Sequence, residues 1–351
     1  MNDATDGSDG SNVSDPSNLN EPGGPSGRAP EELASLEQAA DLAQRLRAEV
    51  AKAVVGQQAA VDQVLTTLLA SGHALLEGVP GLGKTLLARA LAAAFAGETS
   101  RVQFTPDLMP ADVVGHVIYD AQAGMRTRRG PVFTNLLLAD EINRAPAKTQ
   151  AALLEVMQEG QVTIEGESLP VPSPFLTLAT QNPIEMEGTY PLPEAQLDRF
   201  LLKIRLDYPS EAEEVALVEH VTTGRVGDLL PVDQVRAIAT PADVEAAQAA
   251  TATLRVDERV REYAVRIVRA TRERADLAIG AGPRGAIAIL RASRAHALLA
   301  GRDFVIPGDI KTVALAALRH RVQLSPEAEI EGQNADTILE AVLGEVEAPR
   351  A

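Results

Sequence analysis

Residues 78–85, Gly-Val-Pro-Gly-Leu-Gly-Lys-Thr, combine three glycines, a lysine and a hydroxyl at a spacing that suits phosphate binding. The glycines let the backbone curl so that successive N–H groups point at one anion. Lys84 adds a mobile cation for the β- and γ-phosphates of a nucleotide, and the Thr85 hydroxyl can ligate Mg²⁺. The segment therefore predicts a loop that holds a nucleoside triphosphate and its metal ion.

The predicted nucleotide contacts extend to both sides of this loop. A Gly-Gln turn at Val54-Val55-Gly56-Gln57 separates two helical stretches ahead of the loop and can pack against a base. A helix that begins at the end of the loop would present its positive N-terminus to the phosphates. We expect the nucleotide to contact Val55, Gly56, Gly78, Pro80, Gly81, Leu82, Gly83, Lys84, Thr85, Leu86 and Asp140.

Two adjacent carboxylates, Asp140 and Glu141, end the apolar run 135–139 and form the second candidate. In a phosphate-loop protein, an Asp at this position holds Mg²⁺, usually through water. A following Glu is placed to orient and deprotonate the attacking water. The alternative is an ordinary strand followed by an acidic turn. The metal ligands predicted from the sequence are thus Thr85 and Asp140.

Three more polar residues lie where they could reach a phosphate. Asn182 follows the buried run 175–180, where an amide can touch the γ-phosphate or its water, although an Asn at a strand end is also common. Arg199 lies near the end of a short helix. Arg284 begins a helix after Gly-Pro, where a cation is unfavourable for the helix dipole, and this favours a role facing an anion.

The elements that must position these residues alternate between strands and helices. Strands are expected at 74–76, 102–104, 135–139, 161–165, 175–180 and 200–204, with helices at 31–50, 57–68, 85–95, 148–159 and 194–200. This order predicts an α/β fold, a parallel sheet with helices on both faces and the nucleotide at the carboxyl ends of the strands. The proline-rich segment 169–174 cannot be a central strand.

The chain divides by composition into four parts. Residues 1–29 are too polar to bury a core and are expected to be a disordered acidic tail. Residues 30–208 form the α/β nucleotide-binding domain. Residues 209–345 are expected to form a smaller all-α domain, with helical runs at 242–253, 257–276, 284–301 and 308–321. The last residues, 346–351, are expected to be frayed.

A hairpin at 117–129 interrupts the α/β unit. Its second arm carries Arg126, Arg128 and Arg129. It is either a loop that touches a substrate or a solvated hairpin, and the sequence does not separate the two.

Composition excludes several classes of protein. The chain of 351 residues has no Cys, so disulfides and thiolate metal sites are excluded, and its five His are scattered without ligand spacing. A net charge of −17 and 3% aromatic residues without Trp argue against a protein that coats nucleic acid or stacks bases. We expect no secretion signal and no membrane span, and therefore a cytoplasmic protein.

In sum these motifs resemble the AAA+ ATPases, and among them the MoxR family. The resemblance covers roughly residues 33–325. The stretches that carry it are Val54–Gln57, Gly78–Thr85 (Walker A), Gln103–Asp107, Ala139–Ala145 (Walker B), Ala179–Pro183, Glu194–Phe200, Gly282–Arg284 and Leu318–Val322. The resemblance implies ATP as the nucleotide and a lid as the role of the helical domain.

The resemblance also implies a role for each candidate residue. Lys84 and Thr85 resemble the phosphate and Mg²⁺ residues, Asp140 the Mg²⁺-coordinating acid and Glu141 the catalytic base. Asn182 resembles the sensor of the attacking water. Segments 115–130 and 161–174 resemble the inserts that mark this branch of the family.

Two arginines receive roles that involve different subunits. Arg199 resembles the arginine finger, which reaches the γ-phosphate bound by the neighbouring subunit. Arg284 resembles the second sensor, on the lid of the same subunit as the nucleotide. An arginine supplied by a neighbour is typically worth about 10³–10⁵ in rate, so the active form implied is a ring, a hexamer by resemblance.

The function implied is a chaperone-like ATPase that remodels or matures protein complexes. Such proteins often act with a partner that bears a von Willebrand factor A domain. A nucleotide-gated assembly scaffold with little turnover is one alternative, against which the intact Glu141 and Arg199 argue. A nucleic-acid motor is another, against which the acidic charge argues.

Overall fold

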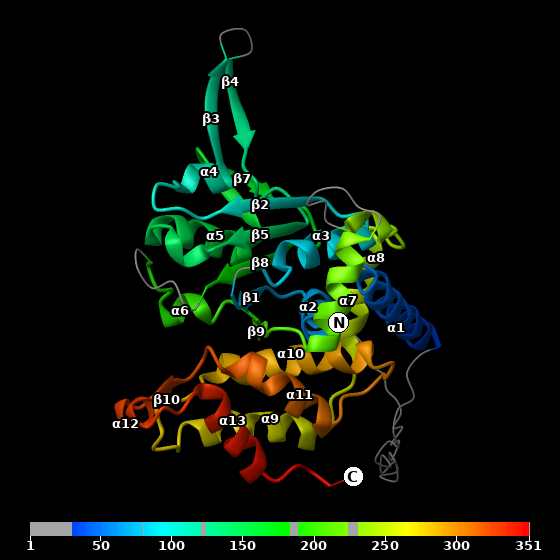
Figure 1. Cartoon of the computed structure of the whole chain (residues 1–351), viewed down its shortest axis with the longest axis vertical. Coiled ribbons are helices and arrows are strands. Elements are labelled where there is room, and N and C mark those ends of the chain that lie inside the picture. Colours follow the sequence, from blue (N-terminus) through cyan, green and yellow to red (C-terminus); the bar gives the residue numbers. More distant parts are fainter. Residues whose placement is uncertain (1–29, 80, 121–123, 183–188, 224–230, 351) are drawn as a thin grey trace, which may run out of the picture.

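The computed structural model describes residues 30–79, 81–120, 124–182, 189–223 and 231–350. An α/β part forms the upper half of the molecule in Figure 1, and helices α9 to α13 form the lower half, with α8 beside α1 higher up. The tail expected at 1–29 lies outside the described residues. Helices of the first part are α1 (Pro30–Val50), α2 (Gln58–Leu69), α3 (Lys84–Ala94), α4 (Pro110–Val114), α5 (Ala147–Glu159), α6 (Glu194–Leu197) and α7 (Glu211–Thr222), with 3₁₀ turns at Ile142–Arg144 and Pro231–Gln234.

Five parallel strands form the central sheet in the order β2-β5-β8-β1-β9. They are β1 (Ala74–Glu77), β2 (Thr99–Gln103), β5 (Leu136–Asp140), β8 (Leu176–Gln181) and β9 (Leu202–Arg205). The expected α/β fold with a parallel sheet is therefore confirmed. The register pairs Glu77 with Gln181 and Gln103 with Asp140, so the strands end side by side at one edge.

Alternate side chains of each strand enter two different cores. Leu76 and Leu138 pack with α1, α2 and α3 on one face, while Leu75 and Leu137 pack with α5 on the other. The expectation of helices on both faces is confirmed. The first core continues without a break into the lid helices, because α1 packs against both α8 and α10.

Two antiparallel hairpins extend from the α/β part. The first, β3 (Gly115–Asp120) with β4 (Gly124–Arg129), projects from the top of the molecule in Figure 1. Tyr119 and Met125 near its tip are 77% and 75% exposed. The second pairs β6 (Gln161–Ile164) with β7 (Glu167–Pro170). The strand β7 was not expected, but it pairs only with β6, so its proline occupies no central position.

The base of the first hairpin admits no side chains at two crossing glycines. Gly115 has φ +101°, and a Cβ placed on it would lie 2.3 Å from the carbonyl oxygen of Arg128. A Cβ on Gly130 would lie 2.3 Å from the carbonyl oxygen of Val113. The two backbones are thus in direct contact, which fixes the direction in which the hairpin leaves the body.

The lid consists of α8 (Pro241–Thr253), α9 (Glu258–Thr271), α10 (Pro283–Leu299), α11 (Pro307–Leu318), α12 (Pro326–Ile330) and α13 (Ala335–Glu345). It also holds a short antiparallel pair, β10 (Leu277–Ile279) with β11 (Gln323–Leu324). The helix expected over 257–276 is shorter in the structure: α9 ends at Thr271, and the chain then leads into β10.

The end of the chain differs from the frayed segment that we expected. Val346 and Ala348 pack against the main core, and Arg266 donates a hydrogen bond to the carbonyl oxygen of Glu347 (3.1 Å). Residues 346–350 therefore lie along α9. Ala351 is outside the described residues.

Candidate functional site

A cavity of about 570 Å³ opens at the carboxyl edge of the sheet, beside α3 and α7. It gathers residues that are far apart in the sequence, from the Val-Val-Gly-Gln segment, the phosphate loop, three strand ends and α7. Its lining comprises Val54, Val55, Gln57, Gly81, Leu82, Gly83, Lys84, Thr85, Leu86, Arg101, Gln103, Asp140, Glu141, Thr180, Asn182, Pro209, Leu217 and Val221. Most of the nucleotide contacts expected from the sequence thus share one cavity.

Two of those expected contacts, Gly56 and Gly78, do not line the cavity. Gly56 packs beneath α7, where a Cβ on it would lie 2.9 Å from the Glu213 Cβ. Gly78 lies behind the loop, where a Cβ would meet Leu206 at 2.9 Å. Pro80 is outside the described residues.

The phosphate loop leads directly into α3. Gly81 and Gly83 have φ values of +89° and +74°, which only glycine adopts without strain. Lys84 is the first residue of α3, and its Nζ donates to the carbonyl oxygen of Gly78 at 2.5 Å. Burial lowers the pKa of the Lys84 ammonium, while the charges of Asp140, Glu141 and Glu77 oppose that change. The lysine is thus held by the loop that would receive the phosphates.

Asp140 ends β5 with both carboxylate oxygens engaged. The Thr180 hydroxyl donates to Oδ1 at 2.5 Å, and the Arg101 guanidinium donates to Oδ2 at 2.6 Å. Arg101 lies on the edge strand β2, and its side chain is 55% exposed. The sequence interpretation missed both partners. For Arg101 a signal was present: strand alternation places it on the same face of β2 as Gln103, at the strand next to Asp140.

Glu141 follows in the left-handed conformation, with φ 55°. Its own N–H donates to the Thr180 hydroxyl at 2.9 Å, which holds this turn of the backbone against β8. Its carboxylate oxygen Oε2 accepts hydrogen bonds from Gln103 (2.8 Å) and Arg144 (3.3 Å). The carboxylate therefore faces the cavity beside Asp140 and is held by neighbours on both sides.

The donor set around Asp140 fits Mg²⁺. One carboxylate and the Thr85 hydroxyl line the same cavity, and both are oxygen ligands of the kind that this ion prefers. Within the part of the chain that the structure describes, no group of three or more His, Cys, Asp or Glu side chains could hold a metal ion. An ion here would complete its coordination with water and with the phosphates of the nucleotide.

Asn182 lines the cavity just beyond β8 and is buried, 8% exposed. The structure therefore brings together Lys84, Thr85, Asp140, Glu141 and Asn182, as we expected from the sequence. The helix α7 closes one side of the cavity with Leu217 and Val221, which the sequence interpretation did not identify as site residues.

Arg199 and Arg284 lie in a different cavity. This second cavity, of about 460 Å³, is lined by Ser71, Gly72, His73, Met157, Gln158, Asp198, Arg199, Leu201, Arg284, Ile287, Ala288, Arg291 and Arg321. Arg199 donates to the carbonyl oxygen of Leu154 (2.7 Å), and Arg284 donates to Asp198 Oδ2 (3.3 Å). We call this site the arginine cavity and the first one the nucleotide cavity.

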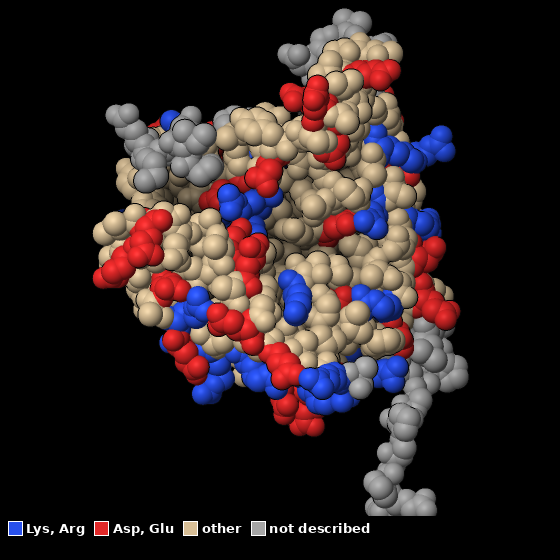
Figure 2. Space-filling model, turned by 60° about the horizontal axis from the view of Figure 1, so that its bottom comes forward, with Lys and Arg blue, Asp and Glu red and all other residues tan. Residues whose placement is uncertain are grey.

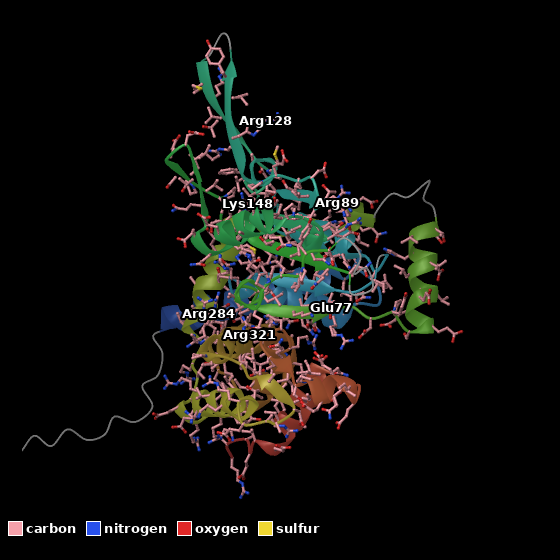
Figure 3. All side chains as sticks on the ribbon, turned by 90° about the vertical axis from the view of Figure 1, so that its left-hand side faces the viewer. Glu77, Arg89, Arg128, Lys148, Arg284 and Arg321 are labelled. Carbon is pink, nitrogen blue, oxygen red and sulfur yellow. The ribbon has the colours of Figure 1, made fainter. Side chains whose placement is uncertain are left out.

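Arg284 lines the arginine cavity and not the nucleotide cavity, and its contact with the nucleotide of its own subunit stays a prediction. Figure 3 shows Arg284 and Arg321 close together at the junction of the sheet and the lid, with Glu77, which precedes the phosphate loop, toward the opposite edge. The reason is the packing of α10, whose buried face lies against α2, α9 and α11 and carries Arg284 to the side away from the loop.

Two further observations concern the charge of the outer surface and the apolar length of the helices. Figure 2 shows acidic and basic side chains interleaved over the lid face rather than one continuous basic surface. No helix of the described residues is long and apolar enough to cross a membrane.

Comparison with known proteins follows the same division into two parts. Residues 73–202 match the model of the ATPase family associated with various cellular activities (AAA), and residues 269–342 match that of the AAA lid domain. The first match contains the whole phosphate loop, Asp140, Glu141 and Asn182.

Several individual proteins are similar over most of their length. Chaperone MoxR1 of Mycobacterium tuberculosis is 44% identical over 339 residues, 94% of this chain and 86% of that protein. The uncharacterized protein YeaC of Bacillus subtilis is 44% identical over 299 residues, 85% of this chain and 92% of that protein. A crystal structure from Cytophaga hutchinsonii, assigned as an ATPase, is 40% identical with a TM-score of 0.84 and covers 91% of this chain and 98% of its own.

Proposed function

Since this chain belongs to the MoxR family of AAA+ ATPases, we propose that it hydrolyses ATP in a ring of its own copies, a hexamer. The observation that supports this most is the separation of the two cavities. Lys84, Asp140 and Glu141 line the nucleotide cavity, whereas Arg199 lines the arginine cavity. An arginine that cannot reach its own nucleotide can serve the nucleotide of a neighbour.

The residues of the nucleotide cavity divide the work of phosphoryl transfer. Lys84 binds the β- and γ-phosphates, and Thr85 and Asp140 would hold Mg²⁺. The ion would neutralise charge that builds up on the phosphate oxygens. Glu141 orients the attacking water and accepts its proton, and Asn182 positions the same water. Gln103 and Arg144 both donate to Oε2 of this carboxylate and so orient Glu141 beside the cavity.

We assign the second arginine to the neighbour's nucleotide as well. Arg284 and Arg199 line one cavity, and Arg284 donates to the carboxylate of Asp198, the residue before Arg199. Together they would place two cations on the γ-phosphate bound by the adjacent subunit. Release of phosphate would remove these contacts and loosen that interface.

The wider role that we propose is a chaperone-like one, the remodelling or maturation of protein complexes in the cytoplasm. A protein with a von Willebrand factor A domain is the proposed partner. This rests on the family, in which the relative from Mycobacterium tuberculosis is named a chaperone.

The test is phosphate release from ATP, measured against protein concentration for wild type, Glu141→Gln and Arg199→Ala. We expect the specific activity to rise with concentration and each variant to lose about 10³-fold or more. In a one-to-one mixture, a competent site forms wherever an Arg199→Ala subunit meets the finger of a Glu141→Gln subunit. Random mixing in a head-to-tail ring should restore about a quarter of wild-type turnover.

Two results would overturn the proposal. Activity that is independent of concentration and survives Arg199→Ala would remove the finger in trans. Nucleotide-dependent assembly without turnover in wild type would instead support a scaffold.

A further inference from the structure

Arg321 is a buried arginine that holds the chain on both sides of Arg199. Its side chain is only 5% exposed, just beyond the end of α11. Its Nε donates to Asp198 Oδ1 at 2.7 Å. Its Nη2 donates to the carbonyl oxygens of Asp198 (3.1 Å) and Phe200 (2.7 Å), and its Nη1 to that of Leu201 (3.3 Å).

This arrangement is specific to a guanidinium. Burial lowers the pKa of the Arg321 side chain, and the bond and charge of Asp198 oppose that change. The planar fork directs several N–H groups at fixed angles, and a lysine ammonium has no such fork. The residues bound are 198, 200 and 201, so the backbone is fixed immediately before and after Arg199.

The Asp198 carboxylate extends the same network to Arg284. Its Oδ1 accepts from Arg321, and its Oδ2 accepts from the Arg284 guanidinium, which is 65% exposed. One buried arginine of the lid thus orients the carboxylate that holds the exposed Arg284, next to Arg199 in the chain.

We propose that Arg321 is a positioning residue for the arginines that this subunit offers to its neighbour. The proposal rests on the proposed function, because it assumes that Arg199 acts in trans. Arg321 acts through the backbone at 198–201 and through Asp198, and it contacts no reacting atom. Loss of Arg321 therefore disables the finger of a subunit while its own nucleotide cavity stays intact.

The complementation assay separates this role from a simple tie between lid and core. We expect Arg321→Gln alone to lower turnover by about 10- to 100-fold, because a misplacement near 1 Å can cost as much. Mixed with Glu141→Gln subunits, it should recover as Arg199→Ala does. Mixed with Arg199→Ala subunits, it should not recover, because neither subunit then supplies a finger.

Arg319→Gln is the matched control. Arg319 also joins the lid to the sheet, donating to Asp336 (2.9 Å) and to the carbonyl oxygen of Lys203 (3.1 Å), and it is 12% exposed. Both of these bonds go to residues outside 198–201. We expect Arg319→Gln to lower the thermal midpoint as much as Arg321→Gln does, with less than a threefold loss of turnover.

A second variant, Asp198→Asn, keeps the test decisive if Arg321→Gln does not fold. It removes the carboxylate charge at nearly constant size, and it should behave as Arg321→Gln does in both mixtures. Binding of a fluorescent ATP analogue to either variant should stay within about twofold of wild type, a readout that a disrupted fold would change.

The possible failures are distinguishable. If Arg199→Ala and Glu141→Gln do not restore each other, the proposed function fails. If they do, but Arg321→Gln and Asp198→Asn gain nothing from Glu141→Gln, only the positioning role is overturned. Recovery of Arg321→Gln by Arg199→Ala, or full activity of Arg321→Gln alone, would overturn it equally.

Discussion

The nucleotide cavity and the arginine cavity differ in their balance of charge. Among the described residues, the nucleotide cavity is lined by two basic and two acidic side chains, Lys84, Arg101, Asp140 and Glu141. The arginine cavity is lined by four arginines and a single carboxylate, Asp198.

The two cavities also differ in how far their charged side chains are neutralised by their hydrogen-bond partners. In the nucleotide cavity Arg101 already neutralises Asp140, and Lys84 rests on the Gly78 carbonyl oxygen. In the arginine cavity Asp198 is shared by two arginines, so positive charge remains in excess. This difference accords with the proposal that the first cavity admits a nucleotide and its metal ion, and that the second meets a nucleotide bound by a neighbouring subunit.

The comparison is tested most strongly by removing one cation from each cavity. Lys84→Met should weaken binding of a fluorescent ATP analogue by roughly 10- to 100-fold, since a hydrogen bond to a charged group is worth about 1.5–3 kcal/mol. Arg284→Gln should leave that affinity within about twofold at concentrations where subunits are dissociated. The measurement is a fluorescence titration of dilute protein. Equal weakening by both changes would mean that Arg284 reaches the nucleotide of its own subunit.

A histidine in the arginine cavity should make the free energy of unfolding depend on pH. His73 lies in its lining and is partly buried, its Nδ1 accepting from the Thr177 N–H (3.0 Å) and its Nε2 facing the Met157 carbonyl oxygen (3.0 Å). Burial lowers the pKa of His73 to about 4, from the ordinary value of 6.5. Between those values the unfolded chain binds more protons, so the free energy of unfolding falls as the pH falls through this window.

His73 should lower the free energy of unfolding by about 2 kcal/mol between pH 7.5 and pH 5. Well above pH 6.5 the histidine is neutral in both states, and its contribution should no longer change with pH. Urea unfolding at a series of pH values measures it. His73→Gln should reduce the dependence, part of which remains because burial also lowers the pKa of His320. His116→Asn, on the exposed strand β3, is the control. An unchanged slope in His73→Gln would show that the imidazole is not what makes the fold sensitive to acid.

The smallest expected effect is that of Arg101 in the nucleotide cavity. Its ion pair with Asp140 competes with Mg²⁺ for one carboxylate, and an exposed pair is worth only about 0.2–1 kcal/mol. Arg101→Gln should therefore lower the Mg²⁺ concentration that half-saturates nucleotide binding by about two- to fivefold. Calorimetric titration of the nucleotide at several Mg²⁺ concentrations would measure this. Arg89→Gln, on an exposed part of α3, is the matched control, and weaker Mg²⁺ binding in Arg101→Gln would contradict the idea of competition.

The residues that sequence reasoning placed correctly share a local origin. Lys84 and Thr85 belong to one turn between a strand and a helix, and Asp140, Glu141 and Asn182 follow the ends of buried strands. Parallel strands bring such ends to a single edge, so their proximity follows from the strand pattern alone. The sheet itself could be predicted for the same reason, because its central strands are continuous apolar runs.

The residues that sequence reasoning missed, and the cavity that Arg284 lines, depend on packing between distant segments. The location of Arg284 is set by α10, which packs against α2 and α11, and no local pattern states that geometry. Arg101 lies on an edge strand whose residues are mostly exposed, where the apolar signal is weakest. The bond network of Arg321 joins residues that are more than a hundred positions apart.

Because Gly115 and Gly130 cross in direct backbone contact, the long hairpin should move together with α4 as one rigid arm. The hairpin follows α4 directly in the chain. The segment before α4 is bonded to the carboxyl edge of the sheet, because the Phe104 N–H donates to the Asp140 carbonyl oxygen at 2.8 Å. Each arm has six residues, about 20 Å at the usual rise of a strand. Because the two backbones are in contact at its base, the hairpin should rotate with α4 rather than bend there. A turn of about 10° there would sweep the tip, with Tyr119 and Met125, through roughly 3–4 Å.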